Sequence, residues 1–173
     1  MNGGSIAATA CTQQLQTSCR VALLILEGTT INTNQTYALE FDGASKGNPG
    51  PAGLGVVIYD STGAIVHKLG QALPESTNNE AEYEACIAGL KLAKKLGIKR
   101  LSIRTDSELV AKQLTGEYKI RKRELIELAS QVNSLLDGFE SYTIRHIPRE
   151  QNVLADKLAS SAIKIQAAKD KKK

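Results

Sequence analysis

The sequence is poor in the residues that build disulfide frameworks and zinc sites. Among its 173 residues it has three cysteines, two histidines and no tryptophan. Cys11, Cys19 and Cys86 are odd in number and widely spaced, which matches neither disulfide pairing nor zinc-ligand spacing. We therefore expect an intracellular protein in a reducing compartment.

Long hydrophobic runs are also absent. The longest one, Val21 to Leu26, is far shorter than the roughly 20 residues that cross a bilayer, so no membrane anchor is expected. With 42% hydrophobic and 23% charged residues, the composition suits one catalytic domain with a single core. A monomer is the default expectation, because no heptad pattern or exposed apolar stripe favours assembly.

The two ends of the chain differ from its middle. No acidic residue precedes Glu27, as in organellar targeting segments, but such segments are Arg-rich and only Arg20 is basic here. We expect residues 1–35 to be mainly disordered, with targeting as the alternative, and residues 36–166 to form the domain. The Lys-rich stretch 167–173 is expected to be a solvated tail, with nuclear localisation or nucleic-acid contact as alternatives.

The net charge of +4 is spread unevenly along the chain. Basic clusters occur at Lys94–Lys95, at Lys119–Arg123 and at Lys169–Lys173. Such clusters are compatible with a polyanionic partner, although basic residues are also common on solvated faces.

Hydrophobic periodicity changes several times between the two ends. Thr77 to Glu80 has the spacing of a capping box, which marks the start of a helix, and Pro148 marks the end of a strand. The resulting order predicts an α/β fold, with a mixed five-stranded sheet flanked by helices. Its first three strands form an antiparallel meander, and the other two are parallel. The patterns predict strands at 37–41, 54–59, 64–69, 100–105 and 140–147, and helices at 78–96, 107–114, 121–136 and 152–166.

One carboxylate lies on an apolar helix face. In the helix that begins at Asn78, Glu82 falls within the arc formed by residues such as Ala81, Ala85 and Leu90. A charge on a buried side is costly unless something compensates it. The simpler interpretation of a single such residue is a glutamate that reaches a partner at the rim of the core.

Two further acids follow strands. Asp42 and Asp106 each come one position after an alternating apolar run, on the side of the strand opposite those apolar residues. One strand-terminal aspartate is usually a turn residue. If the two strands are parallel neighbours, however, both carboxylates emerge at the carboxyl end of the sheet, where open α/β sheets bind ligands.

A fourth acid, Asp156, lies at the margin of the apolar arc of the last helix, where a first-turn acid that favours the helix dipole is the alternative. Four converging carboxylates would repel one another and would need cations. Ligation by oxygen alone suits Mg²⁺ or Mn²⁺. Two such ions can activate a water and stabilise the leaving oxygen in phosphodiester hydrolysis.

Four segments that contain these acids resemble, in order and spacing, the signature blocks of type 1 RNase H. The resemblance covers roughly Thr36 to Ile165 and is greatest to the compact domains of plants and some archaea and bacteria. It implies an RNase H fold, metal-binding catalytic carboxylates at Asp42, Glu82, Asp106 and Asp156, and an endoribonuclease that cuts the RNA strand of RNA/DNA hybrids with two Mg²⁺ ions. The segments are Phe41–Gly53, Thr77–Glu82, Thr105–Ser107 and Asn152–Ala159.

The resemblance also implies a set of substrate contacts. The wide minor groove of an A-like duplex displays the 2′-hydroxyls that distinguish RNA from DNA. For two of the asparagines in this set, capping of the helix is an equally good explanation, and both roles are compatible. The implied contacts are Gly43, Ser45, Asn48, Asn78 and Asn79.

The chain departs from the family pattern in two ways. His146 is the one candidate for the mobile histidine found in many members, but strand periodicity and the following Pro148 favour a strand residue. Arg149, Glu150 or Gln151 would then influence the site. The tryptophan-containing basic protrusion of some bacterial members is missing, and Tyr118 to Arg123 is a reduced substitute or a solvated helix start.

Other functions compete with this interpretation. A weakly active or inactive RNase H-like module would bind nucleic acid without cutting it, yet clustered negative charge facing phosphates would not help such a module. A related exonuclease or strand-transfer enzyme and a retroelement-derived domain are further alternatives. The Gly-Asn-Pro-Gly and Thr-Asn-Asn segments favour hybrid cleavage.

Overall fold

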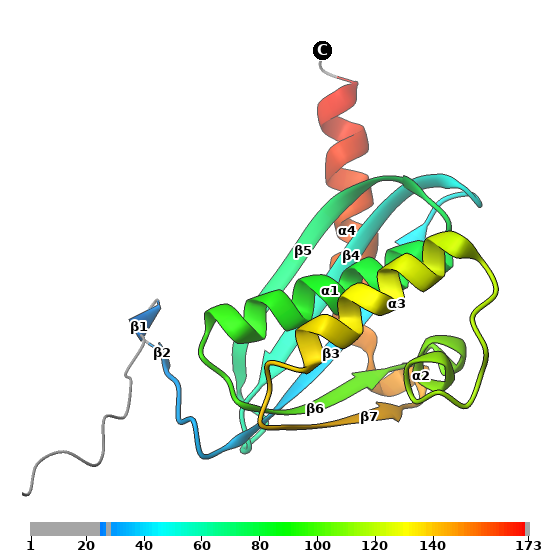
Figure 1. Cartoon of the computed structure of the whole chain (residues 1–173). Helices are drawn as coiled ribbons and strands as arrows, with labels where there is room; N and C mark the ends of the chain where they lie inside the picture. The colour runs from blue at the N-terminus through cyan, green and yellow to red at the C-terminus, as the bar shows by residue number, and fades with distance from the viewer. Residues whose placement is uncertain (1–24, 27–28, 172–173) are drawn as a thin grey trace, which may run out of the picture.

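The computed structural model describes residues 25–26 and 29–171. Five strands form one mixed sheet in the order β5-β4-β3-β6-β7 (Figure 1). β3 pairs antiparallel with β4, which pairs antiparallel with β5, while β6 and β7 run parallel to β3. The predicted meander plus two parallel strands is thus confirmed. The strands are β3 (Thr36–Ser45), β4 (Gly50–Tyr59), β5 (Ile65–Ser76), β6 (Arg100–Thr105) and β7 (Ser141–His146).

Helices cover the sheet on both sides. α1 packs on β3 and β4 with α3 against it, and α4 packs on β3, β4 and β5 from the other side (Figure 1). None of the helices in the described residues has both the length and the apolar character needed to cross a bilayer. The helices are α1 (Asn78–Lys95), α2 (Glu108–Leu114), α3 (Arg123–Leu136) and α4 (Val153–Asp170), with a short 3₁₀ helix η1 (Arg149–Gln151) before α4.

Several elements are longer than the sequence pattern predicted. β3 continues to Ser45 and β5 to Ser76, because backbone pairing with β4 persists where the apolar alternation has ended. α4 continues to Asp170, so part of the Lys-rich segment expected to be a tail is helical. The capping box at Thr77 is present, as predicted, and fixes where α1 begins.

The core begins before the expected domain start at Thr36. Ile31 is 2% exposed and belongs to the main core cluster. Upstream of it, β1 (Ile25–Leu26) and β2 (Thr29–Thr30) form a short antiparallel pair. Most of the segment for which disorder or targeting was predicted lies outside the described residues.

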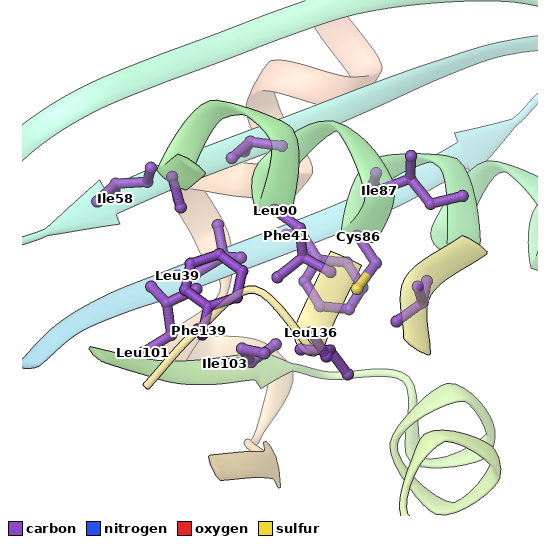
Figure 2. Close-up of a cluster of buried hydrophobic side chains, with 14 of the residues drawn as sticks. Leu39, Phe41, Ile58, Cys86, Ile87, Leu90, Leu101, Ile103, Leu136 and Phe139 are labelled. Carbon is purple, nitrogen blue, oxygen red and sulfur yellow. The ribbon is translucent and has the colours of Figure 1, made fainter. Parts of the chain in front are cut away.

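The main core lies between the sheet and the α1–α3 layer. Figure 2 shows side chains from β3, β6, α1 and α3 converging there, among them Phe41, Ile103, Leu90 and Leu136. Cys86 points into the same core and is fully buried. Burial raises the pKa of its thiol to about 12, so this cysteine serves packing and not chemistry.

Two glycines let helices approach the sheet closely. A Cβ at Gly43 would collide with the backbone of Ala81 and Glu82 in α1, and a Cβ at Gly55 would collide with the backbone of Ala155 in α4. Any side chain at these positions would therefore push a helix outward. The contacts place the first turns of α1 and α4 against the same end of β3.

We predict that Gly55→Ala destabilises the protein by about 1–3 kcal/mol, the usual cost of overpacking, because α4 must move away from β4. Urea denaturation measures this loss. Gly70→Ala is the matched control, since its Cβ would lie 3.1 Å from the Leu158 carbonyl oxygen and a small shift relieves the contact. Equal stability of Gly55→Ala and the wild type would contradict the close-packing argument.

Candidate active site

The register of two parallel strands brings Asp42 and Asp106 together. The last residue pair between β3 and β6 is Glu40 with Arg104, and each aspartate lies two residues beyond that pair. Residues two apart on a strand point to the same side. The two carboxylates therefore emerge side by side at the carboxyl end of the sheet, as the sequence predicted for parallel neighbours.

Helices supply the other two acids. Glu82 lies in the first turns of α1, which rests against Gly43, and Asp156 lies in the first turn of α4. All four carboxylates line one pocket of about 240 Å³. The remaining lining residues are Gly43, Ala44, Asn78, Ser107 and Arg149.

A buried asparagine, Asn152, supports the pocket from within the protein. Its side chain is fully buried, and its amide nitrogen donates to Asp106 Oδ1 at 2.6 Å and to the Phe41 carbonyl at 2.9 Å. From the sequence, Asn152 was expected to begin the last helix and the Asn152–Ala159 segment, with no role of its own in the site; its side chain makes no capping hydrogen bond. The asparagine instead ties β3 to the carboxylate that follows β6. Its position four residues before Asp156 was the available signal.

Two further side chains position carboxylates. Arg149 donates to Asp156 Oδ1 at 3.0 Å, and Asn78 donates to Glu82 Oε1 at 3.0 Å. Among the three residues that sequence analysis named after Pro148, Arg149 is therefore the one that reaches this pocket.

Burial and mutual repulsion disfavour charge on two of the acids. The pKa of Asp42 is raised to about 7, first by burial and then by the negative charges of Asp106, Asp156 and Glu82. The positive charge of Arg149 lowers this pKa and so opposes part of the shift. Burial, with the nearby charge of Asp106, raises the pKa of Glu82 to about 7. Such values are typical of carboxylates that a bound cation must compensate.

The donor set fits a hard divalent cation. The buried Oε2 atom of Glu82 has no hydrogen-bond partner, although it faces a pocket that contains three other carboxylates. All the available ligands are oxygen atoms, which suits Mg²⁺ or Mn²⁺. Within the described part of the chain, no three His, Cys, Asp or Glu side chains are already arranged to hold a metal ion. Arg149, Asn152 and Asn78 each hold one of the carboxylates instead.

The predicted substrate contacts lie at different distances from the pocket. Gly43 and Asn78 line it, whereas Ser45, Asn48 and Asn79 do not. The Ser45 hydroxyl lies 2.7 Å from both the Gly47 and Ser76 carbonyl oxygens, so it stabilises the β3–β4 turn. Asn48 Oδ1 accepts from the Asn78 backbone N–H at 3.4 Å, which places this turn at the start of α1.

The structure places both segments in which the sequence departs from the family pattern, His146 and the basic residues from Lys119 to Arg123. His146 is the last residue of β7 and is exposed, as the strand interpretation predicted. The basic residues from Lys119 to Arg123 lie in the exposed connection between α2 and α3 and at the start of α3. Next to them, the Lys112 ammonium lies 4.9 Å from the centre of the exposed Tyr118 ring.

Sequence comparisons identify relatives of this chain. A family model described as reverse transcriptase-like matches residues 40–162. Ribonuclease HI of Halobacterium salinarum is 44% identical over 123 residues, which are 71% of this chain and 62% of that protein. A bifunctional protein of Mycobacterium tuberculosis is 39% identical over 72% of this chain and 35% of its own length. The aligned region thus spans less than two thirds of either relative.

Two solved structures of RNase H1 match over nearly the whole of their chains. The RNase H1 crystal structure from Halobacterium salinarum superposes with a TM-score of 0.74 at 42% identity, covering 75% of this chain and 98% of that one. The LC11-RNase H1 structure in complex with an RNA/DNA hybrid superposes with a TM-score of 0.72 at 36% identity, covering 76% and 99%.

The raised pKa values predict a pH-dependent cost of keeping the site charged. The pKa of Asp42 rises from 3.8 in the unfolded chain to about 7 in the folded protein. Protonated Asp42 therefore contributes fully to the free energy of unfolding below about pH 4, and this contribution is lost as the pH rises through 7. In EDTA, the free energy of unfolding of Asp42→Asn should therefore increase relative to that of the wild type between about pH 4 and pH 7. The total change in this difference should be of the order of a few kcal/mol.

Urea titrations of both proteins at matched pH values measure this difference. Taking the difference cancels the titration of acids elsewhere in the chain. A difference that is independent of pH would contradict the prediction. Added Mg²⁺ should stabilise the wild type more at pH 8 than at pH 5, because ion binding competes with protons.

Proposed function

Since this chain belongs to the reverse transcriptase-like family, and within it to the type 1 RNases H, we propose that it is a metal-dependent endoribonuclease that hydrolyses the RNA strand of RNA/DNA hybrids. The observation that carries this proposal is the convergence of Asp42, Glu82, Asp106 and Asp156 in one pocket. A protein that only binds nucleic acid would gain nothing from clustered negative charge facing phosphates.

The four carboxylates are the proposed metal ligands. Two Mg²⁺ ions would supply the activated water and the stabilisation of the leaving oxygen, and Mn²⁺ could replace them. The protein's own residues set up the site. Asn152 orients Asp106, Arg149 orients Asp156 and Asn78 orients Glu82, through the hydrogen bonds described above.

The proposed substrate surface begins at the rim of the pocket. Gly43 lines the pocket although it is largely buried, and the Asn78 side chain is exposed beside Glu82. Asn48 and Asn79 lie close by, at the β3–β4 turn and at the start of α1. Small and amide-bearing residues suit contact with 2′-hydroxyls across a minor groove, which would direct the cut to the RNA strand. Ser45 would act through the shape of the turn.

We predict that Asp42→Asn reduces cleavage of an end-labelled RNA/DNA hybrid by at least about 10²-fold in Mg²⁺, because a charged group at the reacting centre is lost. Duplex DNA, duplex RNA, both single strands and an EDTA reaction are the controls. The substitution removes a charge that folding penalises, so the variant should remain at least as stable as the wild type at pH 7.

A wild type that is folded and binds the hybrid, but cuts no substrate in Mg²⁺ or Mn²⁺, would contradict the proposed activity. That outcome would support the catalytically inactive binding module.

We predict that Arg149→Ala lowers kcat/KM by roughly 10-fold, as is usual when a partner of a metal-ligating carboxylate is lost. Its charge lowers the pKa of Asp42, so the acidic limb of the pH–rate profile should also move to higher pH. Arg149→Lys keeps the charge and should restore the position of this limb, even where the hydrogen bond to Asp156 is weaker. A profile that is unchanged in Arg149→Ala would show that the arginine plays no part in positioning the site.

A further inference from the structure

A second pocket lies on the side of the sheet that α4 occupies, beyond the edge of that helix. α4 packs on β3, β4 and β5, whereas Ser102 and Arg104 on the same side of β6 remain partly exposed. The pocket has a volume of about 640 Å³, and we call it the open-face groove. Its charged lining residues are Glu40, Asp60 and Arg104, and Tyr59, Ser102 and Gln151 also line it. Asp60 follows β4 in the turn to β5, whereas Arg104 lies near the end of β6 that leads to Asp106.

An ion pair between a buried carboxylate and a partly exposed guanidinium lies in this groove. Glu40 is only 6% exposed, and its Oε1 lies 3.5 Å from Arg104 Nη1, directly across the β3–β6 pairing. Burying a carboxylate costs free energy and adds little stability even when it is paired. The Glu40 carboxylate instead positions the guanidinium of Arg104, whose side chain is 41% exposed. The ion pair is made through Nη1, one of the three nitrogens of a guanidinium that carries five N–H donors.

The open-face groove begins where the catalytic pocket ends. Arg104 lies near the end of β6, and Asp106 directly follows that strand, two residues further on and roughly 7 Å away at the rise of an extended chain. The 3₁₀ helix η1 touches both cavities, since Arg149 lines the catalytic pocket and Gln151 lines the groove. Arg145, the register partner of Arg104 on β7, is exposed beside it and adds a second positive charge.

The chemistry of the groove matches a single nucleic-acid strand. Guanidinium groups bind phosphodiesters, and the Ser102 hydroxyl can bond a 2′-hydroxyl or a base edge. Two other hydroxyls hold carboxylates of the groove, since Thr62 donates to Asp60 Oδ1 at 2.6 Å and Tyr59 hydrogen-bonds Glu40. The partly exposed Tyr59 also offers an aromatic ring for stacking. A pocket of this volume has the size of a site for a small ligand, so it would accept one or two nucleotides and exclude a duplex.

We propose that the open-face groove binds the single-stranded RNA that continues from the hybrid out of the catalytic pocket, with Arg104 and Arg145 contacting its phosphates. The inference rests on the proposed hybrid-cleaving function. It adds a preference for hybrids that carry an RNA overhang, which a blunt duplex cannot satisfy.

The test compares hybrids with the same duplex region that are blunt, or carry an RNA or a DNA overhang at either end. The wild type should show a several-fold lower KM for an RNA overhang at one end. The triple variant Glu40→Gln/Arg104→Gln/Arg145→Gln, which leaves no buried carboxylate without its cation, should lose this advantage while its kinetics on the blunt hybrid stay unchanged. The slope of log Kd against log salt should fall by about 1.4 for the overhang substrate, at about 0.7 per lost phosphate contact. The matched control is Lys91→Gln/Lys95→Gln, which removes the same number of positive charges from the exposed side of α1.

Two more variants separate binding from folding. Arg104→Gln alone would leave the buried Glu40 without its cation, so Glu40→Gln/Arg104→Gln removes both charges, and Arg145→Gln leaves the ion pair intact. Each folded variant should lose part of the overhang advantage. An overhang that gives the wild type no advantage, or an advantage that these variants retain, would overturn the proposal.

Fluorescence anisotropy of the same substrates in EDTA keeps the two proposals distinguishable. If the wild type cuts no hybrid, the proposed function fails. The open-face groove is then still supported by tighter binding of the overhang that Arg145→Gln weakens, and is rejected if blunt and overhang substrates bind equally. An RNA overhang that binds no better than a DNA overhang would also overturn the assignment to RNA.

Discussion

Repulsion among four carboxylates in one partly buried pocket is the constraint on which the rest of this site depends. Burial and neighbouring charges raise the pKa values of Asp42 and Glu82 to about 7, so their charged forms are costly in the folded protein. Gathering these carboxylates in one pocket therefore lowers the stability of the folded protein. Binding of the divalent cation that we propose would offset this cost and would link the stability of the domain to its chemistry.

The scaffold meets this constraint with backbone contacts and neutral donors. Gly43 and Gly55 let α1 and α4 rest directly on the sheet, so that Glu82 and Asp156 reach the end of β3. Asn152 then joins Phe41 and Asp106 from a fully buried position. These contacts hold oxygen ligands in place without adding a positive charge that would compete with a metal ion.

Arginines occupy the side of the site that is open to solvent. Arg149 pairs with Asp156 at the pocket, and Arg104 pairs with the buried Glu40 further along the same side of the sheet. In both pairs a carboxylate from the scaffold restricts the guanidinium, which reduces the entropy lost when a phosphate binds. His146, by contrast, ends β7 and does not line the pocket.

The sequence by itself determined the type and order of the elements, because hydrophobic periodicity, the Thr77 capping box and the stop at Pro148 are local signals. It also singled out Asp42, Glu82, Asp106 and Asp156, through their positions relative to the apolar patterns together with the resemblance of their segments to type 1 RNase H. It did not predict the full lengths of β3, β5 and α4, where backbone pairing or helix propagation continues past the pattern. Only the tertiary structure decided the roles of Asn152, Arg149 and the Glu40–Arg104 pair, because these depend on the contact of segments far apart in the chain, which no local period encodes.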